Sequence, residues 1–482
     1  MTLAFPLLRR VLPVLAVLVV APLGVAREPA AVLPVEISAS PESLAAWQYK
    51  FSAADEALLD EIQRGCFQYF WREVGNPACL ARDKSSDTVC SIAAVGFQLA
   101  SLPIGVERGW ITRDQGRERA LAVLQSLTQR SDNKKFGIYL HFLDENTGGL
   151  PDYSRTKYRY ELQASTVDHA LLQAGAMAAA EYFGGEVAAA AAPIINDADW
   201  RAMFDHEAGY MTMGWKASTD RGPAGPGTIP DAHWQWSSDE ERLVDFLAVG
   251  APHEHAIEPA VYYRLRRIVK QHDDLPPYVV SWNGSLFTYF FSHCWIDYRH
   301  LAADNPAKFG EDGPAVDWFE NSRRATLTHR ARCIEVSDKF PTLGKNRWGL
   351  APCTYREHYF VHEVQPNLSN RDEWYGGVLP PYAAAAAIMF TPAESLAALR
   401  EYRSLKGADG KPLAWRDPAQ GGFGFVDSFT LDPPYGHNDN LGIDQGPMLL
   451  AIENARTGLV WRLFMQHPAA KRAVERLQLE RR

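Results

Sequence analysis

The sequence predicts an all-α fold, an (α/α)6 toroid: a double ring of helices with long loops and one small β-hairpin. Apolar residues recur at spacings of three and four along a dozen segments, whereas alternating strand patterns are scarce. Some segments are apolar on one face only, as expected for outer helices, and others on nearly every side, as expected for inner helices. No sequence recurs at a fixed period, which argues against a helical solenoid, the main alternative.

The segment 53–74 illustrates the helical pattern. Ser52 can cap its first turn, and Leu59, Ile62 and Cys66 recur along one face at spacings of three and four. A helix of this kind packs one stripe against a core. The predicted helices are 53–74, 86–108, 112–130, 162–183, 197–206, 238–250, 257–271, 284–295, 314–335, 378–389, 391–405 and 444–465.

Alternation around Asn146–Gly149 predicts the hairpin, within residues 137–155. Four loops between the predicted helices are long, polar and rich in aromatic residues. Loops longer than about fifteen residues in a compact domain are usually functional or disordered, and the aromatic content argues against disorder. We therefore expect binding chemistry in these loops, which are 207–237, 272–283, 336–377 and 406–443.

Residues 1–26 differ from the rest of the chain. Two arginines precede an apolar run that ends in small residues, which is typical of a secretory signal peptide. We expect residues 27–50 to be a leader, 51–468 a single catalytic domain and 469–482 a charged tail. No later segment is apolar enough to span a membrane, so a periplasmic or secreted protein is predicted.

The formal net charge is −9, and removal of Arg9 and Arg10 with residues 1–26 would make it −11. Nucleic acids and anionic lipids bind clustered Lys and Arg, so neither is expected as a partner. A neutral ligand and a monomer are expected. Six cysteines could pair in an oxidising compartment in fifteen ways, and the sequence decides none of them. Buried free thiols are the simplest interpretation of Cys66 and Cys294, which lie in apolar helical patterns.

The loops and helix starts combine Trp and Tyr with amide and carboxylate groups, the combination that binds sugars. Pyranose rings offer C–H faces for stacking and hydroxyls for hydrogen bonds. No metal-ligand spacing, nucleotide loop or nucleophile-elbow motif is present, so no metal and no cofactor are expected. The candidate substrate-binding residues are Asp87, Trp236, Asn283, Trp348, Trp374, Tyr375, Asp427, Asp444 and Gln445.

Cleavage of a glycosidic bond requires two carboxyl groups. Glu240 is the first candidate, because in the sequence SSDEE it is Glu241 that best fits the capping box, which leaves Glu240 unexplained. Asp168 is the second candidate. It lies near a predicted helix N-terminus, where the helix dipole favours the ionised form that a base or nucleophile needs, although Ser165-x-x-Asp168 could also be a plain cap.

The helix predicted at 444–465 raises a related question. Asp444 is a plausible N-cap and Pro447 fits a first turn, but the preceding loop Gly436–Asp439 is unusually flexible and polar. A loop of this kind, held by a rigid helix, often carries binding residues. Asp444 is therefore predicted to lie at the edge of a binding cleft.

Several blocks of sequence occur in order between residues 66 and 465. They include RDKSSDTVCSIAAVGFQLASLPIGVERGWITRDQ, VDHALLQAG, DEERLVDFLAVGAP, GFVDSF and IDQGPMLLAIENARTGLVWRLFM. The chain thereby resembles the glycoamylase-like domain family, which includes endo-β-1,2-glucanases of glycoside hydrolase family 144 and related domains of cyclic β-1,2-glucan synthases. The resemblance implies an (α/α)6 toroid, a β-1,2-glucan substrate and no cofactor.

The family's essential glutamate falls on Glu240, and an acid at a second helix start falls on Asp168, where the family has glutamate. A further acid of that motif falls on Ser165. The resemblance therefore implies an exported glycoside hydrolase, endo-acting on β-1,2-glucan, with Glu240 as general acid and Asp168 as base or nucleophile. Two alternatives stay open: a transglycosylase that uses the same acids, and, because of Ser165, a glucan-binding protein without catalysis.

Overall fold

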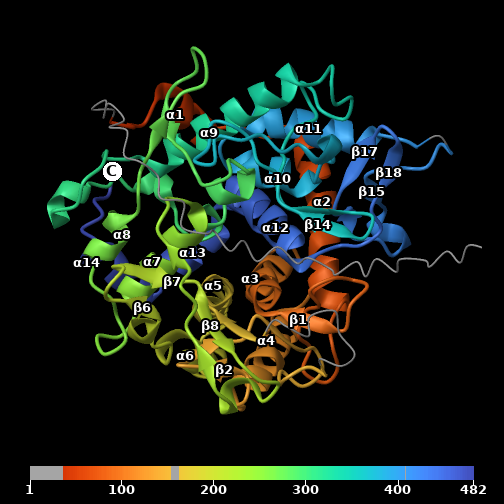
Figure 1. The fold of residues 1–482 in the computed structure, drawn as a ribbon. Coiled ribbons are helices and arrows are strands. Elements are labelled where there is room, and N and C mark those ends of the chain that lie inside the picture. The colour runs from red at the N-terminus through yellow and green to blue at the C-terminus, as the bar shows by residue number, and fades with distance from the viewer. Residues whose placement is uncertain (1–35, 153–161, 408) are drawn as a thin grey trace, which may run out of the picture.

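The computed structural model describes residues 36–152, 162–407 and 409–482. Within these ranges the chain forms fourteen α-helices, several 3-10 helices and eighteen short strands, so the predicted helix-rich class is confirmed. The strands pair in antiparallel sheets of two or three strands that connect the helices (Figure 1).

Five helices lie toward the centre of the molecule. The helices α3 (Ile92–Glu107), α5 (Thr166–Phe183) and α7 (Asp239–Gly250) pack in a row, and α12 (Gly442–Thr457) packs on the other side of α3. The fifth helix, α10 (Pro381–Ala386), packs against α12. Most residues of α3, α5 and α12 are buried, as their nearly continuous apolar sequences predict.

A second set of helices covers the first. The helix α2 (Ala53–Arg72) packs on α3 and α12, and α4 (Arg113–Thr128) and α6 (Gly185–Asn196) cover α3 and α5. Similarly, α11 (Pro392–Ser404) packs on α10. These helices bury one stripe each, and the Ser52 cap predicted for α2 is confirmed by its hydrogen bond from the Asp55 amide. The remaining helices are α1 (Pro41–Trp47), α8 (Ala260–Arg264), α9 (Trp318–Glu335), α13 (Leu459–Gln466) and α14 (Pro468–Arg476).

The strands are short and lie mainly in the connecting loops. They are β1 (Val89–Ser91), β2 (Lys134–Lys135), β3 (Ile138–Tyr139), β4 (Phe142–Asp144), β5 (Gln163–Ser165), β6 (Phe204–Asp205), β7 (Tyr210–Thr212), β8 (Gly214–Ala217), β9 (Gly227–Thr228), β10 (His233–Trp234), β11 (Val269–Lys270), β12 (Tyr278–Val279), β13 (Cys353–Tyr355), β14 (His358–Phe360), β15 (Trp415–Arg416), β16 (Gly424–Phe425), β17 (Phe429–Leu431) and β18 (Pro434–Gly436).

Close backbone contacts at glycine fix the central helices. A Cβ atom at Gly175 of α5 would overlap the backbone of Gly96 in α3, and a Cβ at Gly96 would overlap Leu171 of α5. On the other side of α3, the ring of Phe97 occupies the space where a side chain of Gly446 in α12 would lie. Only glycine permits these approaches, so α3 holds α5 and α12 at a fixed distance.

Several helix predictions were wrong in extent or type. The segment predicted as helix 284–295 forms two 3-10 helices, Leu286–Tyr289 and Ser292–Cys294. Similarly, the segment predicted as helix 197–206 forms a 3-10 turn followed by β6, and the segment predicted as helix 257–271 contains only α8 and then β11. The helix α6 was not predicted. The helix predicted at 444–465 divides into α12 and α13 because Gly458 adopts a left-handed conformation with φ +66°.

The predicted hairpin around residues 146–149 is also wrong within the described residues. Strand β4 pairs with β1, and β3 pairs with β2. The turn that follows is held by Asp144, whose carboxylate accepts hydrogen bonds from the Asn146 amide and the Thr147 hydroxyl. Residues 153–155 of the predicted second strand lie outside the described residues.

The segments predicted to be a leader and a tail both pack on the helical body. In the part of 27–50 that is described, α1 contacts α9, and the Trp47 and Phe319 rings meet edge to face at 5.5 Å. At the other terminus, α14 packs against α7 and buries Ala469 and Ala470, so residues 469–482 are not a free tail. The predicted signal peptide, 1–26, lies outside the described residues.

No helix in the described ranges is both long enough and apolar enough to cross a bilayer. All six cysteines are free. Cys66 and Cys294 are buried, as predicted, and burial raises the pKa of both thiols far above its usual range.

We predict that Gly175→Ala destabilises the protein by about 3 kcal/mol, at the upper end for an overpacked core, because its methyl group meets backbone rather than a movable side chain. Urea denaturation followed by circular dichroism measures the loss. Glu181→Ala, at an exposed position of α5, is the control and should stay within about 0.5 kcal/mol of wild type. Equal stability of both variants would show that the contact between α3 and α5 does not constrain the fold.

Candidate active site

Three central helices carry a carboxyl group in the first turn, and a fourth acid lies in the loop that leads through β1 into α3. Asp168 is the third residue of α5, Glu240 the second of α7 and Asp444 the third of α12, and Asp87 lies in the loop before α3. Because α7, α5, α3 and α12 pack in that order, the acids lie along one row. The sequence could place these residues at helix starts, and the packing brings the helix starts together.

Glu240 is the acid of its helix start that makes no local cap. Ser238 is the N-cap residue: its hydroxyl accepts the Glu240 amide at 3.3 Å and donates to the Glu241 carboxylate. Glu241 is therefore held by the N-cap side chain, but the predicted capping box, in which it would accept the Ser238 amide, is not formed. Asp239 forms a buried ion pair with Arg242. Glu240 alone of these three acids is left partly exposed.

The environment of Glu240 favours its neutral form. Loss of solvent around the carboxyl group, and then the negative charge of Asp168, raise its pKa to about 8. The indole N–H of Trp234, just before α7, donates to the Thr166 hydroxyl at the start of α5 at 2.9 Å. This bond joins the two helix starts that carry Glu240 and Asp168. The carboxyl group of Glu240 can thus hold a proton at neutral pH.

Asp168 occupies the first turn of α5, where its amide donates to the Ser165 hydroxyl at 3.4 Å. The predicted cap at Ser165 is therefore present. The carboxylate points away from this cap, and its Oδ1 atom lies 3.5 Å from His141 Nε2, with 14% of the side chain exposed. A partly exposed carboxylate at a helix N-terminus is suited to act as a base or a nucleophile.

Asp427 and Asp444 form a second carboxyl pair. Both are buried and close enough for each to shift the pKa of the other, and two buried carboxyl groups so placed cannot both be ionised, so the pair retains a proton. Burial, followed by the charge of Asp427, raises the pKa of Asp444 well above its usual range. One oxygen of Asp427 accepts the Thr354 amide at 2.8 Å.

The loop before α3 is tied to the loop before α12. Asp439 accepts hydrogen bonds from the hydroxyls of Ser85 and Ser86 at 3.1 and 2.6 Å, and Lys84 bridges to Leu441. Asp87 is mostly buried, and one of its oxygens accepts the Thr88 amide at 2.8 Å. These contacts hold the loop that contains Asp87 beside the start of α12.

The other predicted binding residues are more scattered. Trp236 is partly buried under the Arg266 guanidinium, 4.7 Å from the ring centre. Tyr375 is 42% exposed and stacks on Phe360 at 4.3 Å, while Trp374 is largely buried against Phe340. The Gln445 amide donates to the Phe425 carbonyl at 3.2 Å, next to the second carboxyl pair.

Three sequence predictions need correction. Trp348 is fully buried, and its backbone is hydrogen bonded to the Tyr402 hydroxyl, so it fills the core rather than meeting a sugar. Asn283 is also fully buried and forms a turn by accepting the Ser285 amide. Asp444 is not the N-cap of α12: that position belongs to Leu441.

Sequence reasoning missed three residues near these acids: His141 beside Asp168, and Tyr359 and Lys84 near the second carboxyl pair. The Lys84 ammonium lies 5.7 Å from the Tyr359 ring centre. Lone His, Lys and Tyr residues in loops give no motif. Only the alternation in TYREHYF, Thr354–Phe360, could have indicated the hairpin that carries Tyr359.

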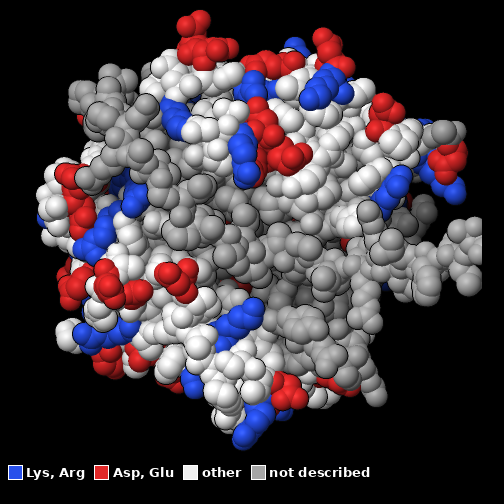
Figure 2. Space-filling view, in the orientation of Figure 1, with Lys and Arg blue, Asp and Glu red and all other residues white. Residues whose placement is uncertain are grey.

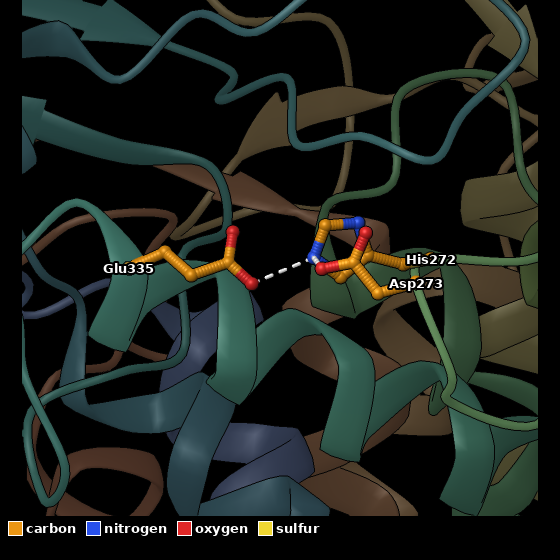
Figure 3. Close-up of side chains that lie close together, drawn as sticks. All are labelled: His272, Asp273 and Glu335. Atoms are coloured by element: carbon orange, nitrogen blue, oxygen red, sulfur yellow. Dashed lines mark hydrogen bonds and ion pairs between the residues drawn. The ribbon is translucent and has the colours of Figure 1, made fainter.

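The charges on the visible face fit a neutral ligand. Basic and acidic side chains alternate around its rim and form no patch of one sign among the described residues (Figure 2). One surface cluster there, His272, Asp273 and Glu335, brings potential metal ligands within 4.8 Å of one another (Figure 3). His272 Nε2 lies 2.6 Å from Glu335, which Arg332 also neutralises, so an ion-pair network explains the cluster.

Comparison with known proteins bears on this arrangement. Residues 233–468 match the model of the glycoamylase family, described as "Putative glucoamylase". The matched region includes Glu240 and the Asp427–Asp444 pair, and the predicted family resemblance is confirmed.

The chain is 26% identical over 465 residues to an exo β-1,2-glucooligosaccharide sophorohydrolase from Parabacteroides distasonis, covering 89% of this chain and 58% of the relative. It therefore spans a little over half the length of that curated relative. Its fold matches an endo-β-1,2-glucanase from Chitinophaga pinensis in complex with sophorotriose and glucose, with TM-score 0.71, 23% identity and coverage of 89% and 99% of the two chains.

A β-1,2-glucanase structure from Parabacteroides distasonis matches with TM-score 0.73 and 24% identity, over 89% of this chain and 60% of that one. These two structural matches support a common fold. Each of them covers 89% of this chain.

We predict that Asp444→Asn raises the melting temperature, and by more at pH 8 than at pH 4.5. The raised pKa means that the folded protein holds a proton which the unfolded chain releases, so this carboxyl costs stability as pH rises above the unfolded pKa of about 4. The asparagine keeps a donor for Asp427 without that cost. Scanning calorimetry at both pH values measures the shift. A pH-independent difference would contradict the retained proton.

Proposed function

We propose that this protein is a glycoside hydrolase that acts on β-1,2-glucan, with Glu240 as its general acid. The main support for the proposal is the raised pKa of the Glu240 carboxyl group, which lies in the first turn of α7 near Asp168. A glycosidase acid needs a raised pKa, and a nearby second carboxylate is its usual partner. The names of the relatives, a sophorohydrolase and endo-β-1,2-glucanases, support the substrate class.

In the proposed reaction, Glu240 gives its proton to the glycosidic oxygen as the bond to the anomeric carbon breaks. Asp168 either takes a proton from the attacking water or attacks the anomeric carbon itself, and in both cases must be ionised. The negative charge of Asp168 raises the pKa of Glu240, so Glu240 stays protonated until it transfers its proton to the leaving oxygen. No cofactor is required for this chemistry.

We extend the proposal to an endo-acting, exported enzyme whose two sets of helices close an (α/α)6 ring. The row of α7, α5, α3 and α12, covered by α2, α4 and α6, supports such a ring. Residues 51–468 would form the catalytic domain with α1 and α14 packed on it. Asp87, Asp427, Asp444 and Gln445 would bind sugar hydroxyls or support the acids.

We predict that the protein releases new reducing ends from linear β-1,2-glucan and that Glu240→Gln lowers kcat by at least about a thousandfold. The amide has the shape of the acid but no proton to give. Products of mixed length indicate endo action, and uniform disaccharide indicates exo action. Longer or cyclised products, seen by mass spectrometry, would favour a transglycosylase.

Asp168→Asn should lose activity to a similar degree, and Asp114→Asn, at an exposed position in the first turn of α4, is the matched control that should keep it. Binding of glucan by wild-type protein with no cleavage of any β-glucan would leave only a glucan-binding protein. The same cleavage by Glu240→Gln as by wild type would exclude Glu240 as the acid.

The pH dependence gives a separate prediction. Because the acid must be protonated, kcat/KM should fall as pH rises through about 8, the pKa of Glu240. In Asp168→Asn, carboxyl titration by ¹³C NMR should give a lower pKa for Glu240, because one of the two causes of its elevation is gone. An unchanged pKa would show that the two carboxyl groups do not interact.

A further inference from the structure

The hairpin of β13 and β14 is hydrogen bonded to the second carboxyl pair, through Thr354 and Asp427. Its two strands pair so that Thr354 lies opposite Tyr359, and these residues share one face. The Thr354 amide donates to Asp427 at 2.8 Å, and the Ser428 hydroxyl donates to the Thr354 carbonyl. The strand that positions Tyr359 is therefore fixed to the residues that it faces.

Tyr359 combines an exposed ring with an enclosed hydroxyl. Tyr359 is 48% exposed, which places it among the most exposed large hydrophobic residues in the described ranges. Burial of the hydroxyl end, and then the charges of Asp444 and Asp427, raise the pKa of Tyr359 well above its usual range. Tyr359 thus lies near enough to the carboxyl pair to feel its charge, while much of the ring surface stays open.

Polar groups without partners occur on the hairpin strand opposite Tyr359, in the first turn of α12 and in the loop that contains Lys84. Among the described residues no donor or acceptor reaches the buried Thr354 hydroxyl or the Gln445 carbonyl oxygen, and one oxygen of Asp87 is also without a partner. The Lys84 ammonium lies over Tyr359, 5.7 Å from the ring centre. Buried polar groups are normally hydrogen bonded, so these unpaired groups remain able to hydrogen bond to a ligand.

We propose that Tyr359 is a sugar-stacking platform that, with Lys84, binds a neutral pyranose unit of the substrate beside the Asp427–Asp444 pair. This inference rests on the proposed function for its substrate class. An open aromatic face suits the C–H surface of a pyranose, and acceptors and a lysine suit its hydroxyls. The other face of the hairpin is already occupied, because Phe360 stacks on Tyr375 at 4.3 Å.

The test measures binding and catalysis separately. Calorimetric titration of β-1,2-linked gluco-oligosaccharides into Glu240→Gln protein, with and without Tyr359→Ala, should show roughly tenfold weaker binding without the ring. In the active background, Tyr359→Ala should raise KM about tenfold with kcat within about threefold of wild type. Tyr359→Phe keeps the stacking face and should stay within about twofold of wild type in KM.

The matched control is Phe136→Ala. Phe136 is 43% exposed and lies under Lys135 at 5.3 Å, but it belongs to the turn between β2 and β3, at the lower edge of the molecule (Figure 1). It should change neither KM nor affinity. A Tyr359→Ala protein that keeps wild-type affinity and KM, or loses only kcat, overturns the platform.

Failure of the platform and failure of the proposed function are distinguishable. Cleavage by wild type with unchanged KM in Tyr359→Ala overturns the platform alone. If the wild-type protein cleaves no glucan but binds gluco-oligosaccharides, and Tyr359→Ala weakens that binding, the platform is supported and the proposed hydrolysis is excluded. No binding of any gluco-oligosaccharide overturns both.

Discussion

The site depends on how closely α5 and α12 approach α3. Gly96 and Gly175 let the backbones of α3 and α5 touch, and Gly446 accepts the ring of Phe97 on the other side. The helices α5 and α12 each carry an acid within the first turn, so their distances from α3, which lies between them, set the separation of Asp168 and Asp444. A side chain at any of these glycines would widen that distance. The chemistry near Asp168 and Asp444 is therefore constrained by contacts between backbones rather than by the acids themselves.

Burial then gives the acids different protonation states. Glu240 loses solvent and faces the charge of Asp168, whereas Asp444 loses solvent and faces the charge of Asp427. Two groups of acids crowded in a poorly solvated region cannot all ionise, and each group retains a proton. A region of this kind attracts no polyanion and can donate a proton to an uncharged substrate. The described charges on the face seen in Figure 2 form no patch of one sign, which agrees with this.

The sequence predicted the helix-rich class and the setting of Glu240 because both follow from local rules. Period and capping identify helix starts, and elimination by the capping box singled out one acid of three. Contacts distant in sequence were not accessible: the Asp427–Asp444 proton and the burial of Trp348 depend on packing. The β13–β14 hairpin was missed because Arg356 adopts a left-handed conformation in its turn, where a glycine or asparagine would have given the usual signal.

The hairpin joins binding to chemistry through one residue. Asp427 accepts the amide of Thr354, which positions Tyr359, and its charge also raises the pKa of Asp444. A ligand that moves the Tyr359 ring must therefore act on the same carboxyl pair that retains a proton, through a rigid two-stranded element rather than a mobile loop. Glu240, on α7, has no such connection, because its carboxyl is set by its helix and by Asp168. Substrate binding at the hairpin would thus adjust the second pair and leave the proposed acid as the fold placed it.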